Sequence, residues 1–233
     1  MKALALTAFA LVASQSFAAS RVLVDFSEPP RAINYQLTAT QEKQILDSMF
    51  AQHVGNLEEC QDAEAGVHYA TITYAVRGKF TSAPGKQIVA AVRSQDCSSG
   101  RAGTQGHLVL VEEGQVTATA SAQGNGIQLV YDEDGDGLQE VVATDGGTWQ
   151  GYTIVTAGSY TFKNSVIRAT GLIDGPGARD NCGSLEDNKE EIVAVFFKRT
   201  ERPMTVTQKN YVKPCGAANS AFKFHSNGPL EGI

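Results

Sequence analysis

The chain is poor in the residue types that carry several common chemistries. It holds one tryptophan, four cysteines and four histidines, and the histidines are isolated, with no H-x-x-x-H pair. Neither a G-x-S-x-G elbow nor a G-x-x-x-x-G-K-[ST] loop occurs. The sequence therefore predicts no helical zinc motif, no α/β-hydrolase nucleophile and no P-loop nucleotide site.

Basic side chains are also in deficit. There are 19 lysines and arginines against 25 aspartates and glutamates, which gives a formal net charge of −6. A mildly acidic surface argues against nucleic acid and anionic membranes as general partners. We expect the partner to be an unidentified protein or a glycan.

Long apolar runs are missing after the first residues. Ala3 to Val12 is apolar, Lys2 precedes it, and Ser16-Phe17-Ala18 is a small-x-small cleavage pattern. This predicts a signal peptide over residues 1–18, too short for a membrane span. The residue directly after the cleavage point is not a cysteine, so no lipid anchor is predicted. The mature protein, about 215 residues, is expected to be secreted or periplasmic and soluble.

The four cysteines are Cys60, Cys97, Cys182 and Cys215. An even number in an exported chain indicates two disulfides, for which three pairings exist. We favour the pairs 60–97 and 182–215 because each closes a short local loop. A thiolate metal site is the alternative, and the lack of C-x-x-C spacing disfavours it.

Residues 19–56 predict an extended segment followed by the one convincing helix. Residues 21–26 resemble a strand, and Thr38 with Gln41 forms a capping box. Four apolar residues then recur on one helical face, which predicts a helix that packs on a sheet: Ile45, Leu46, Met49 and Phe50.

Residues 57–215 are typical of antiparallel β-structure. Runs rich in Val, Ile, Thr and Tyr alternate with turn residues such as Gly146-Gly147 and Asp174-Gly175-Pro176-Gly177. Strands are expected at 68–76, 87–93, 107–112, 115–121, 127–131, 140–145, 152–156, 159–162, 165–169, 191–198 and 204–208. Residues 216–233 are expected to be a partly disordered tail in which Phe222 and Phe224 allow a short edge strand.

Three segments share one pattern. They begin at Gln87, Glu140 and Glu191, spaced 53 and 51 residues apart, and read Q-I-V-A, E-V-V-A and E-I-V-A. Each follows a polar loop. Intervals of about 50 residues favour propeller-like units of four short strands, with a β-sandwich as the alternative fold.

The second of these loops is the most specific feature of the chain. Asp132, Asp134 and Asp136 stand at alternate positions, with Gly135 and Gly137 after the last two; Leu138 follows with a backbone carbonyl, and Glu140 closes the series. This is the ligand order of the first half of an EF-hand, but residue 143 is alanine and both flanks resemble strands. Hard oxygen donors favour Ca²⁺ over Zn²⁺ or Cu²⁺, and Mg²⁺ requires stricter geometry. We expect a Ca²⁺ loop between two strands.

Residues 129–143 resemble an FG-GAP repeat. Such repeats build integrin-type β-propellers in which a D-x-D-G-D-G-x-x-[DE] loop binds Ca²⁺ between two strands of a blade. The resemblance implies metal ligands at Asp132, Asp134, Asp136, Leu138 (carbonyl) and Glu140. The other two repeat segments lack these aspartates, so no metal is implied there.

A weaker candidate site lies just beyond this loop. Trp149 and Tyr152 flank a glycine-containing turn, where they either stack on a ligand or form local core. The favoured function is a non-catalytic, Ca²⁺-stabilised binding or structural module of the cell envelope or extracellular space. A secreted hydrolase, with glycans as one candidate substrate class, is the alternative, because two catalytic carboxylates can lie far apart in sequence.

Overall fold

The computed structural model describes residues 20–52, 61–62, 67–68, 70–96, 103–149, 151–183, 189–199, 205–217 and 220–230. The expected signal peptide, Cys60 and Cys97 lie outside these ranges. The described helix and strands are α1 (Ala39–Gln52), β1 (Arg21–Asp25), β2 (Gln61–Asp62), β3 (Val67–His68), β4 (Ala70–Gly78), β5 (Gln87–Asp96), β6 (Gly103–Glu112), β7 (Gln115–Ser121), β8 (Gly126–Tyr131), β9 (Glu140–Trp149), β10 (Tyr152–Thr161), β11 (Arg168–Asp180), β12 (Glu190–Arg199), β13 (Thr205–Pro214) and β14 (Lys223–Asn227).

The predicted helix is confirmed together with its cap. The Gln41 backbone N–H donates to Thr38 Oγ1 at 3.3 Å, and the Thr38 N–H donates to Gln41 Oε1 at 2.9 Å. This reciprocal pair satisfies orphan donors at the first turn. Ile45 and Met49 are buried against the outer face of β4–β7, with Leu46 and Phe50 beside them.

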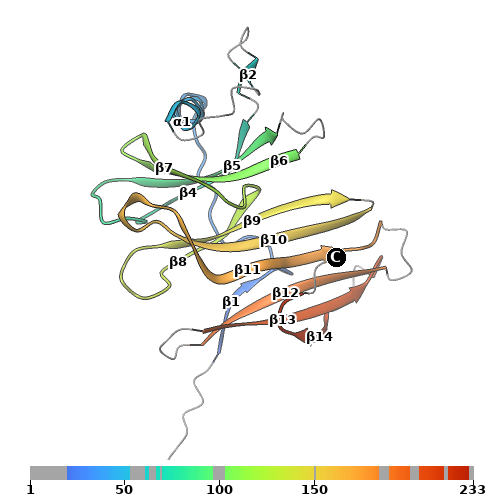
Figure 1. Ribbon diagram of the computed structural model, residues 1–233. Helices are drawn as coiled ribbons and strands as arrows, with labels where there is room; N and C mark the ends of the chain where they lie inside the picture. Colours follow the sequence, from blue (N-terminus) through green and yellow to red (C-terminus); the bar gives the residue numbers. More distant parts are fainter. Residues whose placement is uncertain are drawn as a thin grey trace, which may run out of the picture.

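Two antiparallel sheets form most of the structure. The small sheet has the order β4-β5-β6-β7, and the large sheet runs β14-β13-β12-β11-β10-β9-β8 with β1 beside β12. Figure 1 shows them stacked, with α1 above the small sheet and the large sheet below. The two-stranded hairpin β2–β3 is separate from both sheets. The predictions of a mainly β protein with one N-terminal helix are confirmed.

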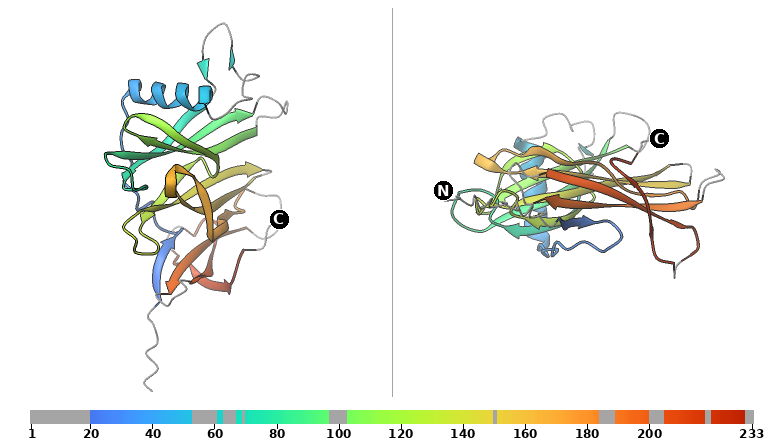
Figure 2. Two further views of the ribbon diagram at one scale, coloured as in Figure 1. Left: turned by 60° about the vertical axis from the view of Figure 1, so that its left-hand side comes forward. Right: turned by 90° about the horizontal axis from the view of Figure 1, so that it is seen from below.

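The propeller expectation is wrong. The segments that begin at Glu140 and Glu191 lie on β9 and β12, two strands of one continuous sheet, whereas blades would place them in separate sheets. The large sheet curls into a half-barrel instead (Figure 2). Its first strands pack face to face on the small sheet, as the sandwich alternative anticipated, through a core that contains Phe80, Leu108 and Phe162.

The curl arises where β12 changes partners. β11 pairs with β12 only at residues 178–180, and beyond this point β1 takes its place, with Val24 opposite Phe196. Strands β12–β14 and β1 thereby fold over the other face of β9–β11. Val24, Ile173 and Phe196 fill the space between them with further apolar side chains.

Two glycine-rich stretches that predicted turns lie inside strands. Gly146 and Gly147 belong to β9, and residues 174–177 belong to β11. A Cβ on Gly146 would lie 2.8 Å from the Ile154 carbonyl oxygen, and one on Gly177 would lie 2.7 Å from the Phe26 ring. Here glycine permits close packing and does not reverse the chain. Residues 152–156 and 159–162, expected as two strands, form one strand apart from Phe162, which follows β10.

The segment after β1 joins the two sheets. The backbone N–H groups of Arg31 and Ala32 donate to the Gln128 carbonyl on β8, at 2.9 and 3.2 Å. Three residues later, the Tyr35 N–H donates to the Ala75 carbonyl on β4 at 2.7 Å. The expected edge strand near Phe224 is also present as β14, which pairs with β13.

Candidate metal centre in the β8–β9 loop

The acidic loop joins two paired strands, as its flanks predicted. Tyr131 at the end of β8 pairs with Glu140 at the start of β9, and residues 132–139 connect them. Gly135 and Gly137 have φ values of 79° and 82°, a region that glycine enters without steric cost. The loop is therefore a tight hairpin connection that carries alternating acids.

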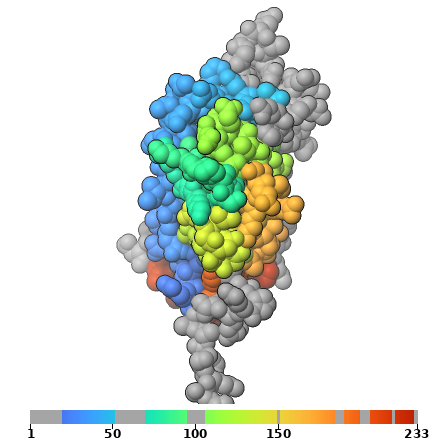
Figure 3. Space-filling view, turned by 90° about the vertical axis from the view of Figure 1, so that its left-hand side faces the viewer, coloured from blue at the N-terminus to red at the C-terminus, as the bar shows by residue number. Residues whose placement is uncertain are grey.

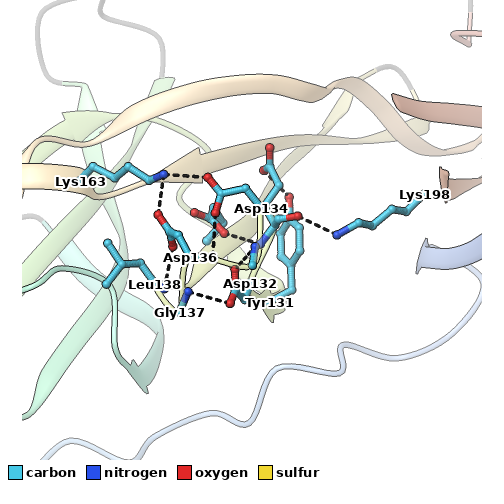
Figure 4. Close-up of polar contacts among 11 residues, drawn as sticks. Tyr131, Asp132, Asp134, Asp136, Gly137, Leu138, Lys163 and Lys198 are labelled. Carbon is cyan, nitrogen blue, oxygen red and sulfur yellow. Dashed lines mark hydrogen bonds and ion pairs between the residues drawn. The ribbon is translucent and has the colours of Figure 1, made fainter. Parts of the chain in front are cut away.

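The loop turns its aspartates towards one another (Figure 4). Both carboxylate oxygens of Asp132 accept backbone hydrogen bonds, from Gly135 at 2.7 Å and from Gly137 at 3.0 Å. The Leu138 N–H donates to Asp136 Oδ1 at 2.8 Å. One carboxylate oxygen from each of Asp132, Asp134 and Asp136 lies within 4.8 Å of the others. Three of the five predicted ligands are thus brought together.

Glu140 forms the base of the loop and lies outside this group of three. Its side chain is only 2% exposed, and its Oε2 accepts the Glu133 backbone N–H at 2.7 Å. Burial raises the pKa of Glu140 to about 7, and the charges of Glu133, Asp134 and Asp136 add to the increase. Leu138, the fifth predicted ligand, lies in the loop between Asp136 and Glu140. An ionised Glu140 is therefore costly unless a cation accompanies it.

Two lysines from other parts of the chain reach the loop. Lys163, in the short segment η2 (Lys163–Ser165), forms ion pairs with Asp134 at 2.8 Å and with Asp136 at 2.7 Å. The Lys198 ammonium group donates to the Glu133 carbonyl at 2.7 Å. Sequence reasoning missed both lysines, because each is distant in sequence and stands in no motif. They balance only part of the charge of five nearby carboxylates.

The β4–β5 loop provides an internal comparison. It lies directly against the acidic loop, where the Gln139 N–H donates to the Lys79 carbonyl at 2.7 Å and the Lys79 N–H donates to Gln139 Oε1 at 2.8 Å. Figure 3 shows the two loops side by side, in green and yellow. Gln87, the first residue of β5, occupies the position that Glu140 occupies in β9.

Gln87 fills its own loop with a neutral amide. It is 1% exposed, its Oε1 accepts the backbone N–H groups of Phe80 and Thr81, and its Nε2 donates to Thr81 Oγ1 at 2.7 Å. A carboxylate at this position can accept hydrogen bonds but cannot donate one when ionised. Ionised Glu140 thus lacks the N–H donor that the Gln87 amide supplies, and a cation would provide the missing positive charge. The repeat pattern in the sequence carried this signal.

The donor set fits Ca²⁺ on the observations above. All the side-chain groups are carboxylates, three of them converge, and a buried fourth lies at the base of the loop. Carboxylate oxygen ligands suit Ca²⁺, which tolerates irregular coordination, better than Mg²⁺, which demands near-ideal octahedral geometry. Asp180 with Cys182 and Cys215 also cluster, but these two cysteines form a disulfide and offer no thiolate. The predicted pair 182–215 is confirmed.

The weaker site lies away from the acidic loop. Tyr152 pairs with Trp149 across the β9–β10 turn, at the far end of the ten-residue strand that Glu140 begins. Tyr152 is half-buried. The structure does not bring these residues together with the aspartates, and their role in ligand binding stays a prediction.

Hydrolytic chemistry finds little support among the described residues. Ser94 Oγ lies 3.0 Å from His107 Nε2, but these side chains are only 2% and 3% exposed, so a substrate cannot reach them. A groove of about 550 Å³ between β11 and the β13–β14 end includes Asp174 as its sole carboxylate among the described lining residues. A glycosidase requires two carboxyl groups across its bond.

No described helix is long and apolar enough to cross a membrane. Comparison with known proteins gives no match to any family model, curated protein or solved structure.

Proposed function

We propose that this chain is an exported, non-catalytic binding or structural module that one Ca²⁺ ion stabilises at the β8–β9 loop. The convergence of Asp132, Asp134 and Asp136 above the buried Glu140 carries the proposal. The local resemblance of residues 129–143 to an FG-GAP repeat agrees with it, without the propeller that such repeats usually build.

In this proposal the cation has a structural role. It neutralises the three aspartates, and its charge lowers the cost of ionising Glu140. The loop is bonded to the β4–β5 loop through Gln139 and Lys79, so order in one loop is transmitted to the other. The metal would therefore hold together the ends of two sheets.

The test is thermal unfolding of residues 19–233 in EDTA and in millimolar Ca²⁺, with calorimetric titration of the metal. We expect a higher melting temperature with Ca²⁺ and a smaller increase with equal Mg²⁺. Asp134→Asn should abolish most of the increase, because it removes one of the three converging carboxylates. Asp174→Asn, an exposed acid on β11, is the matched control and should respond as the parent does.

An unchanged melting temperature together with no calorimetric signal would disprove the metal proposal. The hydrolase alternative predicts turnover of a glycan or ester substrate by the folded protein. Such turnover, lost on replacing a carboxylate outside the loop, would contradict the non-catalytic part of the proposal alone.

A further inference from the structure

Charge is segregated along this chain. Residues 202–230 contain four of its 19 lysines and arginines and none of its 25 acids, although the chain as a whole carries a charge of −6. This stretch includes β13 and β14, the last strands of the large sheet. β13 and β14 therefore carry lysines and no acidic residue.

The register places aromatic rings and lysines on one face of these strands. Phe197 pairs with Thr207, and Tyr211 pairs with Phe224. Because side chains alternate along a strand, Lys209, Tyr211 and Lys213 follow Thr207 on the same face. This is the face opposite to Phe196, which is buried in the half-barrel core. We call it the β13–β14 outer face: Phe197, Lys209, Tyr211, Lys213 and Phe224.

The rings and ammonium groups of this face contact one another. The Lys209 Nζ lies 5.1 Å from the Phe197 ring centroid, and the Tyr211 and Phe224 rings meet edge to face at 6.0 Å. The Lys213 Nζ lies 2.9 Å from a Glu191 carboxylate oxygen, so Lys209 is the cation of the face that has no carboxylate assigned to it among the described contacts. Cations held beside aromatic rings suit a ligand that offers both negative charge and flat apolar patches.

Phe224 is unusually accessible for its size. Its side chain is 57% exposed, and only Val22, Ile33 and Val166 join it as exposed large apolar residues in the described chain. Val22 lies on the same face, opposite Phe197. Two of these four exposed large apolar side chains, Val22 and Phe224, thus lie on the β13–β14 outer face or at its margin.

We propose that the β13–β14 outer face binds an anionic glycan, with sugar rings stacked on Phe224 and Tyr211 and a sugar carboxylate paired with Lys209. A pyranose ring offers an apolar C–H face for stacking and, when it is a uronic acid, a carboxylate beside it. Lys209 supplies one positive charge, which one uronate carboxylate of the polymer would pair with. This inference rests on the binding role in the proposed function, for which it names a partner, and it does not depend on the metal.

Other partners match this face less well. β14 has five residues, contains a lysine and meets β13 through a register shift, features that discourage addition of a peptide strand. A nucleic acid binds chiefly through many basic contacts to its phosphates, and this face offers one lysine without an ion pair to the described residues. A glycan is the partner that uses the rings and the lysines together.

Binding of the folded protein to polygalacturonate, measured by affinity electrophoresis and calorimetry, tests the inference. Fully methyl-esterified polymer has the same rings without the charge and should bind at least about fivefold more weakly. Phe224→Ala should weaken binding roughly tenfold, in line with the loss of one stacked ring. Lys209→Gln should weaken it and reduce its dependence on salt. Val166→Ala and Lys43→Gln, exposed positions elsewhere, are the matched controls.

Equal binding of charged and esterified polymer, or full binding by Phe224→Ala with a parental melting curve, would overturn the inference. Tighter binding of polyglutamate, single-stranded DNA or anionic vesicles would replace the glycan with that class of partner. Failure to bind polygalacturonate in EDTA, where Ca²⁺ cannot cross-link the polymer, also overturns it. The melting shift with Ca²⁺ is read separately, so failure here leaves the metal proposal intact.

Discussion

Replacing Glu140 by glutamine should stabilise the metal-free protein and weaken its response to Ca²⁺. The pKa of Glu140 is raised from 4.5 to about 7, chiefly by burial. The folded state therefore holds this proton more tightly than the unfolded state, so the stability of the metal-free protein falls as the pH rises from 4.5 to 7. Above pH 7 the full deficit is present.

The size of this deficit follows from the shift. Each pKa unit corresponds to about 1.36 kcal/mol, so ionised Glu140 destabilises the folded state by about 3 kcal/mol at pH 8. A glutamine has no charge to bury, and Gln87 fits the same position in the neighbouring loop while 1% exposed. At about 2–4 °C per kcal/mol for a domain of this size, Glu140→Gln should raise the melting temperature in EDTA by roughly 6–12 °C.

The assay is thermal and urea unfolding of the parent and Glu140→Gln at pH 8 and pH 5, each in EDTA and in Ca²⁺. The advantage of the variant should be largest at pH 8 in EDTA and should shrink at pH 5. Ca²⁺ should stabilise the parent more than the variant, because the variant keeps the three aspartates but has lost one anionic group of the loop. A variant that is less stable than the parent at pH 8 in EDTA, or that gains as much from Ca²⁺, would refute the reasoning.

Three further predictions concern the surroundings of the loop and the two ends of the fold. Lys163→Met should lower the melting temperature slightly in EDTA and tighten Ca²⁺ binding by calorimetry, since it removes the ammonium group that competes for two of the aspartates; weaker Ca²⁺ binding would contradict this. Burial lowers the pKa of His107, so the folded state disfavours its protonation and stability falls as the pH drops below about 6.5. His107→Gln should flatten that decline by up to about 1.4 kcal/mol per pH unit in the free energy of unfolding, measured by urea unfolding. The exposed control His225→Gln should leave the decline unchanged. Replacing Cys182 and Cys215 together by alanine should cost about 3–4 kcal/mol, because their bridge closes a 33-residue separation, and a loss below about 1 kcal/mol by urea unfolding would contradict the estimate.

Local signals in the sequence predicted much of the secondary structure. A capping box and an apolar face within one short segment predicted the helix, and closely spaced aspartates and glycines predicted the acidic hairpin. These features depend on neighbours a few positions away. Two of the three repeats were correctly predicted as strand beginnings, because Gln87 and Glu140 each start a strand, and β12 begins one residue before Glu191.

The arrangement of the strands could not be derived in the same way. Whether β9 and β12 lie in separate blades or in one sheet depends on pairing between distant segments, which a local repeat does not encode. Gly146 looked like a turn residue because nothing in the sequence shows the Ile154 carbonyl that approaches it. Lys163 lies 29 residues from Asp134, so its place in the candidate site emerges only from the fold.

The partner exchange of β12 sets the order in which the protein can fold. Val22 on β1 pairs with Phe197, about 175 residues later in the chain. Hairpins such as β9–β10 need only a short loop to close, whereas pairing of β1 with β12 must bring together nearly the two ends of the chain. The first strand made is therefore among the last to be placed. Until it docks, the apolar inner side of β12 stays open, and this interval is when the chain is most exposed to misassembly.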